Sequence, residues 1–143
     1  MSINVKVIND SANELPKYET SGAAGLDIRS SERCTLYPGE IELVSTGLSV
    51  EIPEGYEIQV RPRSGLAAKH GITVLNSPGT IDSDYRGKIG VILVNHSKVP
   101  FLIEKGERIG QLVLNKVEQI KWEPVLILSD SDRGEGGFGS TGK

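Results

Sequence analysis

Apolar residues in this chain occur in short runs rich in β-branched side chains, and residues that favour turns separate the runs. We expect strands at Ile3–Ile8, Ile41–Ser45, Leu48–Ile52, Tyr56–Val60, Ile72–Leu75, Ile89–Asn95, Val99–Ile103, Ile109–Val117 and Val125–Leu128. Pro38-Gly39 and Ser77-Pro-Gly79 are among the turn signals, because proline presets φ and glycine tolerates positive φ. Many short strands at this spacing predict an all-β sandwich or barrel.

Two runs differ in how they alternate. Tyr56–Val60 alternates apolar and polar residues, as a half-exposed strand does. Ile89–Val94 does not alternate, so we expect both of its faces to be covered, either at the centre of a sandwich or at a subunit interface. One short helix is predicted, with Ser64 as its N-cap and Gly71 at its end.

The length and charge of the chain limit its possible organisation and binding partners. The 143 residues suit one folded domain over residues 1–132, followed by a glycine-rich arm over residues 133–143. The net charge of −3 provides no general attraction for nucleic acid or for an anionic membrane. We find neither a signal peptide nor a membrane-spanning run, and we expect a soluble cytoplasmic protein. The lone Cys34 excludes an internal disulfide and is expected to be a small buried residue in a strand at Arg33–Tyr37.

The arm itself carries possible chemistry. Five of its eleven residues are glycine, and it also offers the guanidinium of Arg133 and the ring of Phe138. Such a segment is either a frayed terminus or a lid that closes over a flat ring attached to phosphates. Gly134–Thr141 resembles a phosphate-binding P-loop, but it lacks the lysine and opens no helix, which excludes an ATPase of that class.

Two further clusters are candidates for a site. Arg61–Leu66 joins arginines to a helix start, which suits phosphate, although an ordinary helix cap with solvated arginines has the same sequence. Gly79–Gly87 should present polar groups from a hairpin or loop. Its Asp82 could take a proton from water or orient a hydrated cation, and Tyr85 could stack on a ring; an Asx-turn is the simpler alternative.

Metal ligands are scarce in the sequence. His70 and His96 are isolated, and no His/Cys spacing typical of a metal site occurs. Any metal would be a hard cation carried mainly by substrate phosphates and water, which describes Mg²⁺.

Five stretches, taken in order, resemble the sequence motifs of the trimeric dUTP diphosphatases (dUTPases). They are Ala24–Ile28, Pro62–Gly65, Gly79–Gly87, Arg108–Gln111 and Arg133–Gly142. The resemblance implies a homotrimer of distorted jelly-roll subunits with an exchanged C-terminal arm, in which each active site draws on all three chains. It also implies Mg²⁺-dependent hydrolysis of dUTP to dUMP and pyrophosphate, which keeps uracil out of DNA and supplies dUMP for thymidylate synthesis.

The third motif matches the nucleoside-binding part of the family's site. Asp82 matches the carboxylate that activates the attacking water, and Tyr85 matches the ring beneath the deoxyribose. The uracil edge would be read by Asn76 and the hairpin backbone after it, represented by Gly79, Thr80 and Ile81.

The other motifs match the phosphate end and the lid. Phosphate contacts are implied for Arg63, Ser64, Gly65 and Gln111, and Asp27 matches the carboxylate that holds Mg²⁺ through water. In the arm, Phe138 would cover the uracil, and Arg133, Ser140 and Thr141 would contact the γ-phosphate end. Gly139 is also expected to bind the substrate.

Three positions depart from the family pattern without touching an assigned role. They are Gly110, where alanine is usual, Lys88, where an acidic residue is frequent, and Ile28, where leucine is common. Two alternatives remain open at this stage: an enzyme similar to dCTP deaminases, and a non-catalytic trimer that binds a nucleotide for regulation.

Overall fold

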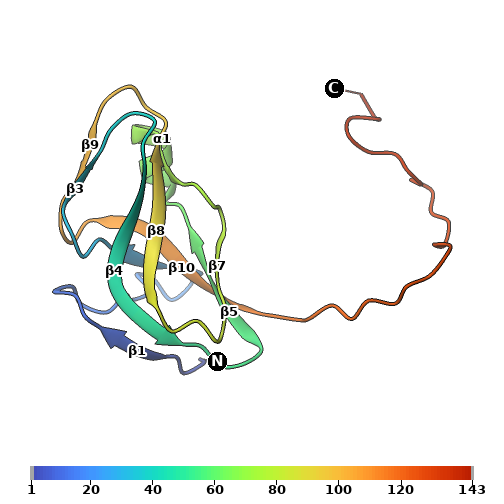
Figure 1. Cartoon of the computed structure of the whole chain (residues 1–143), viewed down its shortest axis with the longest axis horizontal. Helices are drawn as coiled ribbons and strands as arrows, with labels where there is room; N and C mark the ends of the chain where they lie inside the picture. The colour runs from blue at the N-terminus through green and yellow to red at the C-terminus, as the bar shows by residue number, and fades with distance from the viewer. Residues whose placement is uncertain (1, 143) are drawn as a thin grey trace.

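The computed structural model describes residues 2–142 and is built almost wholly of strands (Figure 1). The elements, in chain order, are β1 (Lys6–Asn9), β2 (Leu26–Arg29), β3 (Cys34–Leu36), β4 (Ile41–Glu51), β5 (Tyr56–Arg61), α1 (Ser64–His70), β6 (Ile72–Val74), β7 (Gly79–Ile81), β8 (Lys88–Asn95), β9 (Phe101–Ile103) and β10 (Arg108–Lys116). The predicted all-β jelly-roll class is confirmed. The short strands β2 and β7 lie outside the runs from which strands were predicted.

Two four-stranded sheets enclose the core. One has the order β1-β4-β8-β6 and the other β2-β10-β5-β7, while β3 and β9 form a separate two-stranded sheet. Side chains from both large sheets meet in one buried cluster, which includes Val44, Val91, Val60 and Leu112. Because side chains alternate between the faces of a strand, every second residue of these runs reaches this core.

Strand β4 is continuous where two strands were predicted, and that prediction was wrong. The polar Ser45-Thr-Gly47 looks like a break in the sequence, but the strand passes through it with a shift of register between Ser45 and Ser49. Thr46 is buried, and its Oγ1 donates a hydrogen bond to the carbonyl of Ile89 at 2.7 Å. Gly47 has φ +72°, a conformation that glycine adopts without strain.

Strand β8 is only partly as predicted. It lies between β4 and β6, and its Ile89, Val91 and Leu93 are buried in the core. The opposite face is not fully covered, because Gly90 and Ile92 are half-buried beside an exposed Leu43. The missing alternation therefore reflects an apolar outer face rather than a strand buried on both sides within this chain.

The single helix begins one residue earlier than expected. Arg63, with φ −93° and ψ 129°, is the N-cap, and Ser64 is the first helical residue; no side chain caps this end. Gly71 ends the helix in the left-handed conformation, as predicted. No helix within residues 2–142 is long and apolar enough to cross a membrane.

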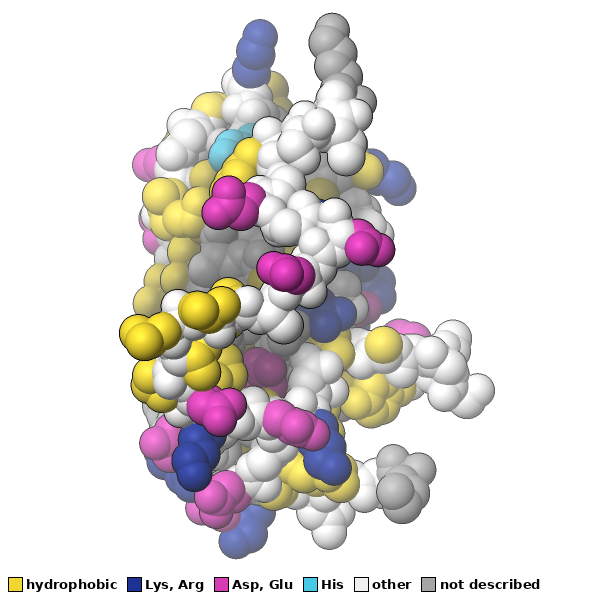
Figure 2. All heavy atoms as spheres, turned by 90° about the vertical axis from the view of Figure 1, so that its right-hand side faces the viewer, with side chains coloured by type: hydrophobic (Ala, Val, Ile, Leu, Met, Phe, Trp, Pro, Cys, Tyr) yellow, Lys and Arg dark blue, Asp and Glu magenta, His cyan; other side chains and the backbone are white. Residues whose placement is uncertain are grey.

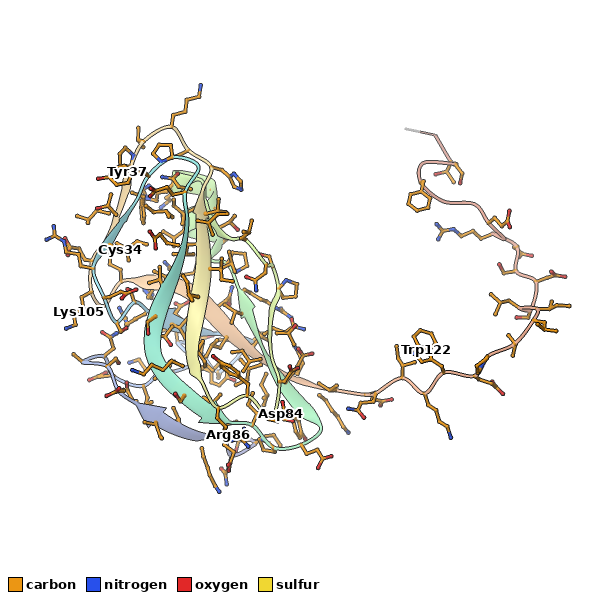
Figure 3. All side chains as sticks on the ribbon, in the orientation of Figure 1. Cys34, Tyr37, Asp84, Arg86, Lys105 and Trp122 are labelled. Carbon is orange, nitrogen blue, oxygen red and sulfur yellow. The ribbon has the colours of Figure 1, made fainter. Side chains whose placement is uncertain are left out.

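After β10 the chain leaves the sheets as a long extended segment, residues 117–142, which we call the C-terminal segment (Figure 1). Val125–Leu128 is not a strand, because no other strand lies beside it to accept and donate ladder hydrogen bonds. Trp122 lies on this segment apart from the sheets and is 82% exposed (Figure 3). On the side from which this segment projects, hydrophobic and acidic side chains are both at the surface (Figure 2).

Candidate functional site

Residues of the third motif gather around one hollow. Its volume is about 470 Å³, and the site residues that line it are Asn76, Gly79, Thr80, Ile81, Asp82 and Tyr85. Strand β7 positions them, because its pairing with β5 sets Gly79 opposite Val60 and Ile81 opposite Ile58. Gly90 and Ile92 of β8 line the same hollow, so it combines an apolar wall with polar groups at its rim. This composition suits a flat ring with a polar edge.

A tight turn places Asp82 and Tyr85. The backbone N–H of Tyr85 donates to the carbonyl of Asp82 at 3.1 Å, and the Tyr85 hydroxyl donates to the carbonyl of Lys88 at 2.9 Å. Among the described residues, no donor reaches the Asp82 carboxylate, which is exposed. The alternative of an Asx-turn is therefore not what this residue adopts, and its carboxylate is free to meet a water molecule or a cation.

Charged groups anchor the outer side of the same loop. Arg86 Nη2 lies 3.5 Å from a carboxylate oxygen of Glu51, and Lys6 Nζ lies 3.1 Å from the other. The hydrogen bond and charge of Lys6, followed by the charge of Arg86, lower the pKa of Glu51. Asp84 and Arg86, both in this loop, lie near the same end of the domain (Figure 3).

A second cluster joins the first, second and fourth motifs. The carboxylate of Asp27 lies 3.6 Å from Arg63 Nε and 3.4 Å from Arg108 Nη1. Gln111 is opposite Asp27 in the pairing of β2 with β10, and its Nε2 donates to the carbonyl of Pro62 at 3.0 Å. Two guanidiniums and one amide thus converge beside a single carboxylate, which leaves this cluster with a positive excess. Such an arrangement suits phosphate.

The start of α1 lies beside this second cluster. Ser64 and Gly65 are exposed at the first helical positions, directly after Arg63. A Cβ added at Gly65 would meet nothing within 4 Å, so the space above its backbone is open. The predicted phosphate residues Arg63, Ser64, Gly65 and Gln111 therefore do lie in one region.

The arm residues lie apart from both clusters. Arg133, Gly139, Ser140 and Thr141 line a hollow of about 560 Å³ that the arm forms with itself. Arg133 Nε donates to the carbonyl of Gly136 at 2.6 Å, which fixes a local turn. The ring of Phe138 is fully exposed and has no partner among residues 2–142.

Strand register separates Asp82 from the phosphate cluster within one chain. Ile81 pairs with Ile58, so Asp82 extends toward the level of Glu57, whereas Arg63 lies beyond the other end of β5. The length of residues 57–63 lies between them, roughly 20 Å in extended conformation. One copy of the chain therefore does not bring the predicted catalytic carboxylate to its own predicted phosphate ligands.

The described residues contain no group of three or more histidine, cysteine or carboxylate side chains that could hold a metal ion. Asp27 is nevertheless a single carboxylate at the edge of a phosphate-type cluster. Because Mg²⁺ is commonly held by one or two carboxylates together with substrate phosphates, Asp27 fits an ion that enters with a polyphosphate.

Two site contacts were not assigned from sequence. Arg108 pairs with Asp27, and its place within Arg108–Gln111 was the only signal for it. Gly25 touches Gln111, since an added Cβ would lie 2.3 Å from Oε1 of that side chain. Both contacts depend on the pairing of β2 with β10, which sequence spacing does not reveal.

Comparison with known proteins identifies the family of the chain. The family model for dUTPase matches residues 11–142. The chain belongs to the dUTPase family. It is 62% identical over 143 residues to a deoxyuridine 5'-triphosphate nucleotidohydrolase of Fusobacterium nucleatum, an alignment that covers 99% of this chain and 98% of that relative.

Solved dUTPases share the fold. The dUTPase of Staphylococcus bacteriophage 80alpha, a G164S mutant with dUpNHpp, has a TM-score of 0.91 at 29% identity and covers 99% of this chain and 100% of its own. A dUTPase mutant from phage phi11 of S. aureus, at 24% identity and a TM-score of 0.82, covers 90% of this chain and 100% of its own. The latter is described as coordinating a structural Mg(II) ion, a property of that protein.

Among the residues that the structure describes, none of the three departures from the family pattern places a side chain in a hydrogen bond or ion pair with an assigned residue; the Tyr85 hydroxyl bonds only the backbone carbonyl of Lys88. Ile28 is fully buried in the core, and Gly110 is buried in β10. Lys88 Nζ forms an ion pair with Asp10 at 3.0 Å, which ties the start of β8 to the loop after β1.

Proposed function

We propose that this protein hydrolyses dUTP to dUMP and pyrophosphate, with a water molecule attacking the α-phosphorus. The observation that carries the proposal is the dUTPase match over residues 11–142. The hollow at β7 supports it, because an unpaired carboxylate, a tyrosine ring and a hairpin backbone meet there. Hydrolysis of a phosphoanhydride requires an oriented water and neutralised charge, and little covalent chemistry.

Asp82 takes the proton from the attacking water. It is suited to this role because no donor among the described residues occupies its carboxylate. Tyr85, in the same hollow, lies beneath the deoxyribose and excludes a 2′-hydroxyl by contact.

The base is selected at the hairpin. Asn76 and the backbone of Gly79, Thr80 and Ile81 line the hollow and offer fixed donors and acceptors to the uracil edge. Cytosine would leave these groups unpaired, and an unpaired buried polar group strongly disfavours binding. The 5-methyl group of thymine would be excluded because it does not fit the shape of the hairpin.

The phosphates bind at the second cluster. Arg63, Ser64, Gly65 and Gln111 hold them, and Arg108 neutralises part of the charge of Asp27. When Mg²⁺ is bound, it spreads the charge that develops on the phosphate oxygens, and Asp27 would hold it through water.

Active sites are shared between copies of the chain in a homotrimer. The separation of roughly 20 Å between Asp82 and Arg63 along β5 supports this arrangement, because a second copy must supply one of the two clusters. A C-terminal segment that extends away from its own sheets supports a contribution from a further copy.

The arm, residues 133–143, is the lid of this site and residues 1–132 form the domain that it closes. Phe138 covers the uracil, Arg133, Ser140 and Thr141 contact the γ-phosphate end, and Gly139 also binds the substrate. A glycine-rich segment closes readily over a ligand and excludes bulk water. Removal of residues 133–143 is expected to lower turnover by orders of magnitude while the melting temperature changes little.

Pyrophosphate release tests the reaction. We expect release from dUTP in the presence of Mg²⁺, and background rates with dTTP, dCTP and UTP. The Asp82→Asn chain should keep nucleotide affinity and lose turnover. Background release from dUTP by the native chain would favour a non-catalytic nucleotide-binding trimer, and ammonia release from dCTP would favour a deaminase.

A mixing experiment tests the shared site separately. Asp82→Asn and Gln111→Ala chains are each expected to be nearly inactive. Unfolded together and refolded as mixed trimers, they should regain activity, because some sites then draw Asp82 from one chain and Gln111 from another. Activity that stays at the level of the separate variants would show that a single chain supplies both residues.

A further inference from the structure

Gly25, which directly precedes β2, lies against the side chain of Gln111 in the phosphate cluster. An ideal Cβ added to Gly25 would lie 2.3 Å from Oε1 of Gln111, 3.2 Å from its Cδ and 3.5 Å from its Cβ. Gln111 pairs with Asp27, and Gly25 lies two residues before Asp27 on the same face of the sheet. The Gln111 amide therefore occupies the space in which any other residue at position 25 would place its side chain.

The same amide is held from the other side. Gln111 Nε2 donates to the carbonyl of Pro62 at 3.0 Å, directly before Arg63. Arg63 in turn reaches the carboxylate of Asp27 at 3.6 Å. The side chain of Gln111 thus connects β10 to the start of β2 and to the residue that follows β5, beside the phosphate cluster.

Backbone conformation does not account for the glycine. Positive φ occurs at several other glycines of the chain, such as Gly39 and Gly71, whereas Gly25 is not among them. An alanine can adopt the Gly25 backbone, so what this position requires is the empty volume beside Gln111.

We propose that Gly25 is a positioning residue, which acts by leaving room for the Gln111 amide between β2 and the Pro62 carbonyl. The proposal rests on the proposed function, in which Gln111 contacts the phosphates. An added methyl group meets the far end of a flexible side chain, so Gln111 can swing away at little cost to the fold. The amide then loses the Pro62 carbonyl and its place in the cluster.

The test compares Gly25→Ala with Gly22→Ala, a control at which an added Cβ meets nothing within 4 Å. For Gly25→Ala we expect kcat/KM for dUTP to fall about tenfold or more, the effect of losing a hydrogen bond to a charged ligand. Its melting temperature should stay close to that of Gly22→Ala, which should keep native kinetics. Native kinetics in Gly25→Ala would overturn the proposal.

A double-mutant cycle separates positioning from a general structural effect. In a Gln111→Ala background the clashing atoms are absent, so adding Gly25→Ala should cost no further activity. If Gly25→Ala lowers kcat/KM in the Gln111→Ala background by the same factor as in the native chain, the proposal is overturned. If Gly25→Ala alone does not fold, Gln111→Ala should restore folding, and failure to restore it would equally count against the contact.

A spectroscopic reading is independent of catalysis. The side-chain amide signals of Gln111, identified by their loss in Gln111→Ala, should shift in the ¹⁵N–¹H spectrum of Gly25→Ala and stay in place in Gly22→Ala. Unmoved signals would overturn the positioning role even if activity changed. Absence of dUTP hydrolysis by the native chain would refute the proposed function alone, because the amide signals would still report the contact.

Discussion

Asn95 offers a direct test of what holds the two-stranded β3–β9 sheet to the domain. It is fully buried at the end of β8, and its Nδ2 donates to the carbonyls of Leu36 and Val99, each at 2.8 Å. Its Oδ1 accepts from the backbone N–H of Ser97 at 2.9 Å and from the Ser97 hydroxyl at 2.7 Å. One side chain therefore joins β8, β3 and the loop before β9.

The cost of Asn95→Ala follows from these four bonds. The Ser97 hydroxyl keeps a second acceptor, the carbonyl of Val99 at 3.0 Å, so its bond to Asn95 is the least costly to lose. The remaining three, at about 1 kcal/mol each, predict a loss of about 3 kcal/mol in the free energy of unfolding. For a chain of this length that corresponds to a fall of roughly 10 °C in melting temperature.

Thermal unfolding, measured at one fixed protein concentration because subunit association shifts the transition, tests this value. Asn115→Ala is the matched control, since the buried Nδ2 of Asn115 has no hydrogen-bond partner among the described residues. We expect this control to change the melting temperature much less. An equal loss in the two variants would refute the reasoning, because hydrogen bonds within the chain would then not explain the cost at Asn95.

Two further predictions concern the hairpin and the cysteine. In Gly87→Ala an added Cβ would lie 2.4 Å from the Tyr85 hydroxyl oxygen, so the Tyr85 ring must move. The ratio of kcat/KM for dUTP to kcat/KM for UTP should therefore fall. An unchanged ratio would contradict the proposed role of the ring in excluding a 2′-hydroxyl. Burial, followed by the charges of Glu32 and Glu42, raises the pKa of the Cys34 thiol, so at pH 8 it should react with iodoacetamide more slowly than in the urea-unfolded chain. Equal rates would show that the folded environment does not disfavour ionisation of the Cys34 thiol.

The class of fold could be predicted from local pattern, whereas its edges could not. β5, β8 and β10 are long enough for their apolar residues to show in the sequence. β2 and β7 contain only four and three residues and lie at the two edges of one sheet, within motifs rich in glycine and polar side chains. Val125–Leu128 shows the opposite error: its residues favour a strand, but a strand also requires a neighbour.

For the site, the identity of the residues could be predicted from the sequence, whereas the distances between them could not. Motif order indicated which residues carry chemistry, and the structure brings Asn76, Asp82 and Tyr85 to one hollow. Their distance from Arg63 depends on the register of β5 with β7, which joins residues far apart in the chain. Sequence spacing does not specify such a register, and the contact of Gly25 with Gln111 was hidden for the same reason.

The glycines of the sequence motifs connect the fold to the site, and Gly65 provides a further test. An added Cβ would meet Gln111 at Gly25, Val60 and then Asn76 at Gly79, and Tyr85 at Gly87, so side chains of this chain explain these three glycines. At Gly65, an added Cβ meets nothing within 4 Å and φ is not positive, so neither crowding nor backbone strain within the chain explains the residue. The proposed function supplies an explanation, because the phosphates of the ligand would approach the backbone at the start of α1. Gly65→Ala should therefore stabilise the fold by about 0.5–1 kcal/mol, because alanine favours the helix, while it weakens binding of a non-hydrolysable dUTP analogue in calorimetry. Stabilisation with unchanged affinity would show that no phosphate approaches this backbone, and Ser64 and Gly65 would lose their proposed role.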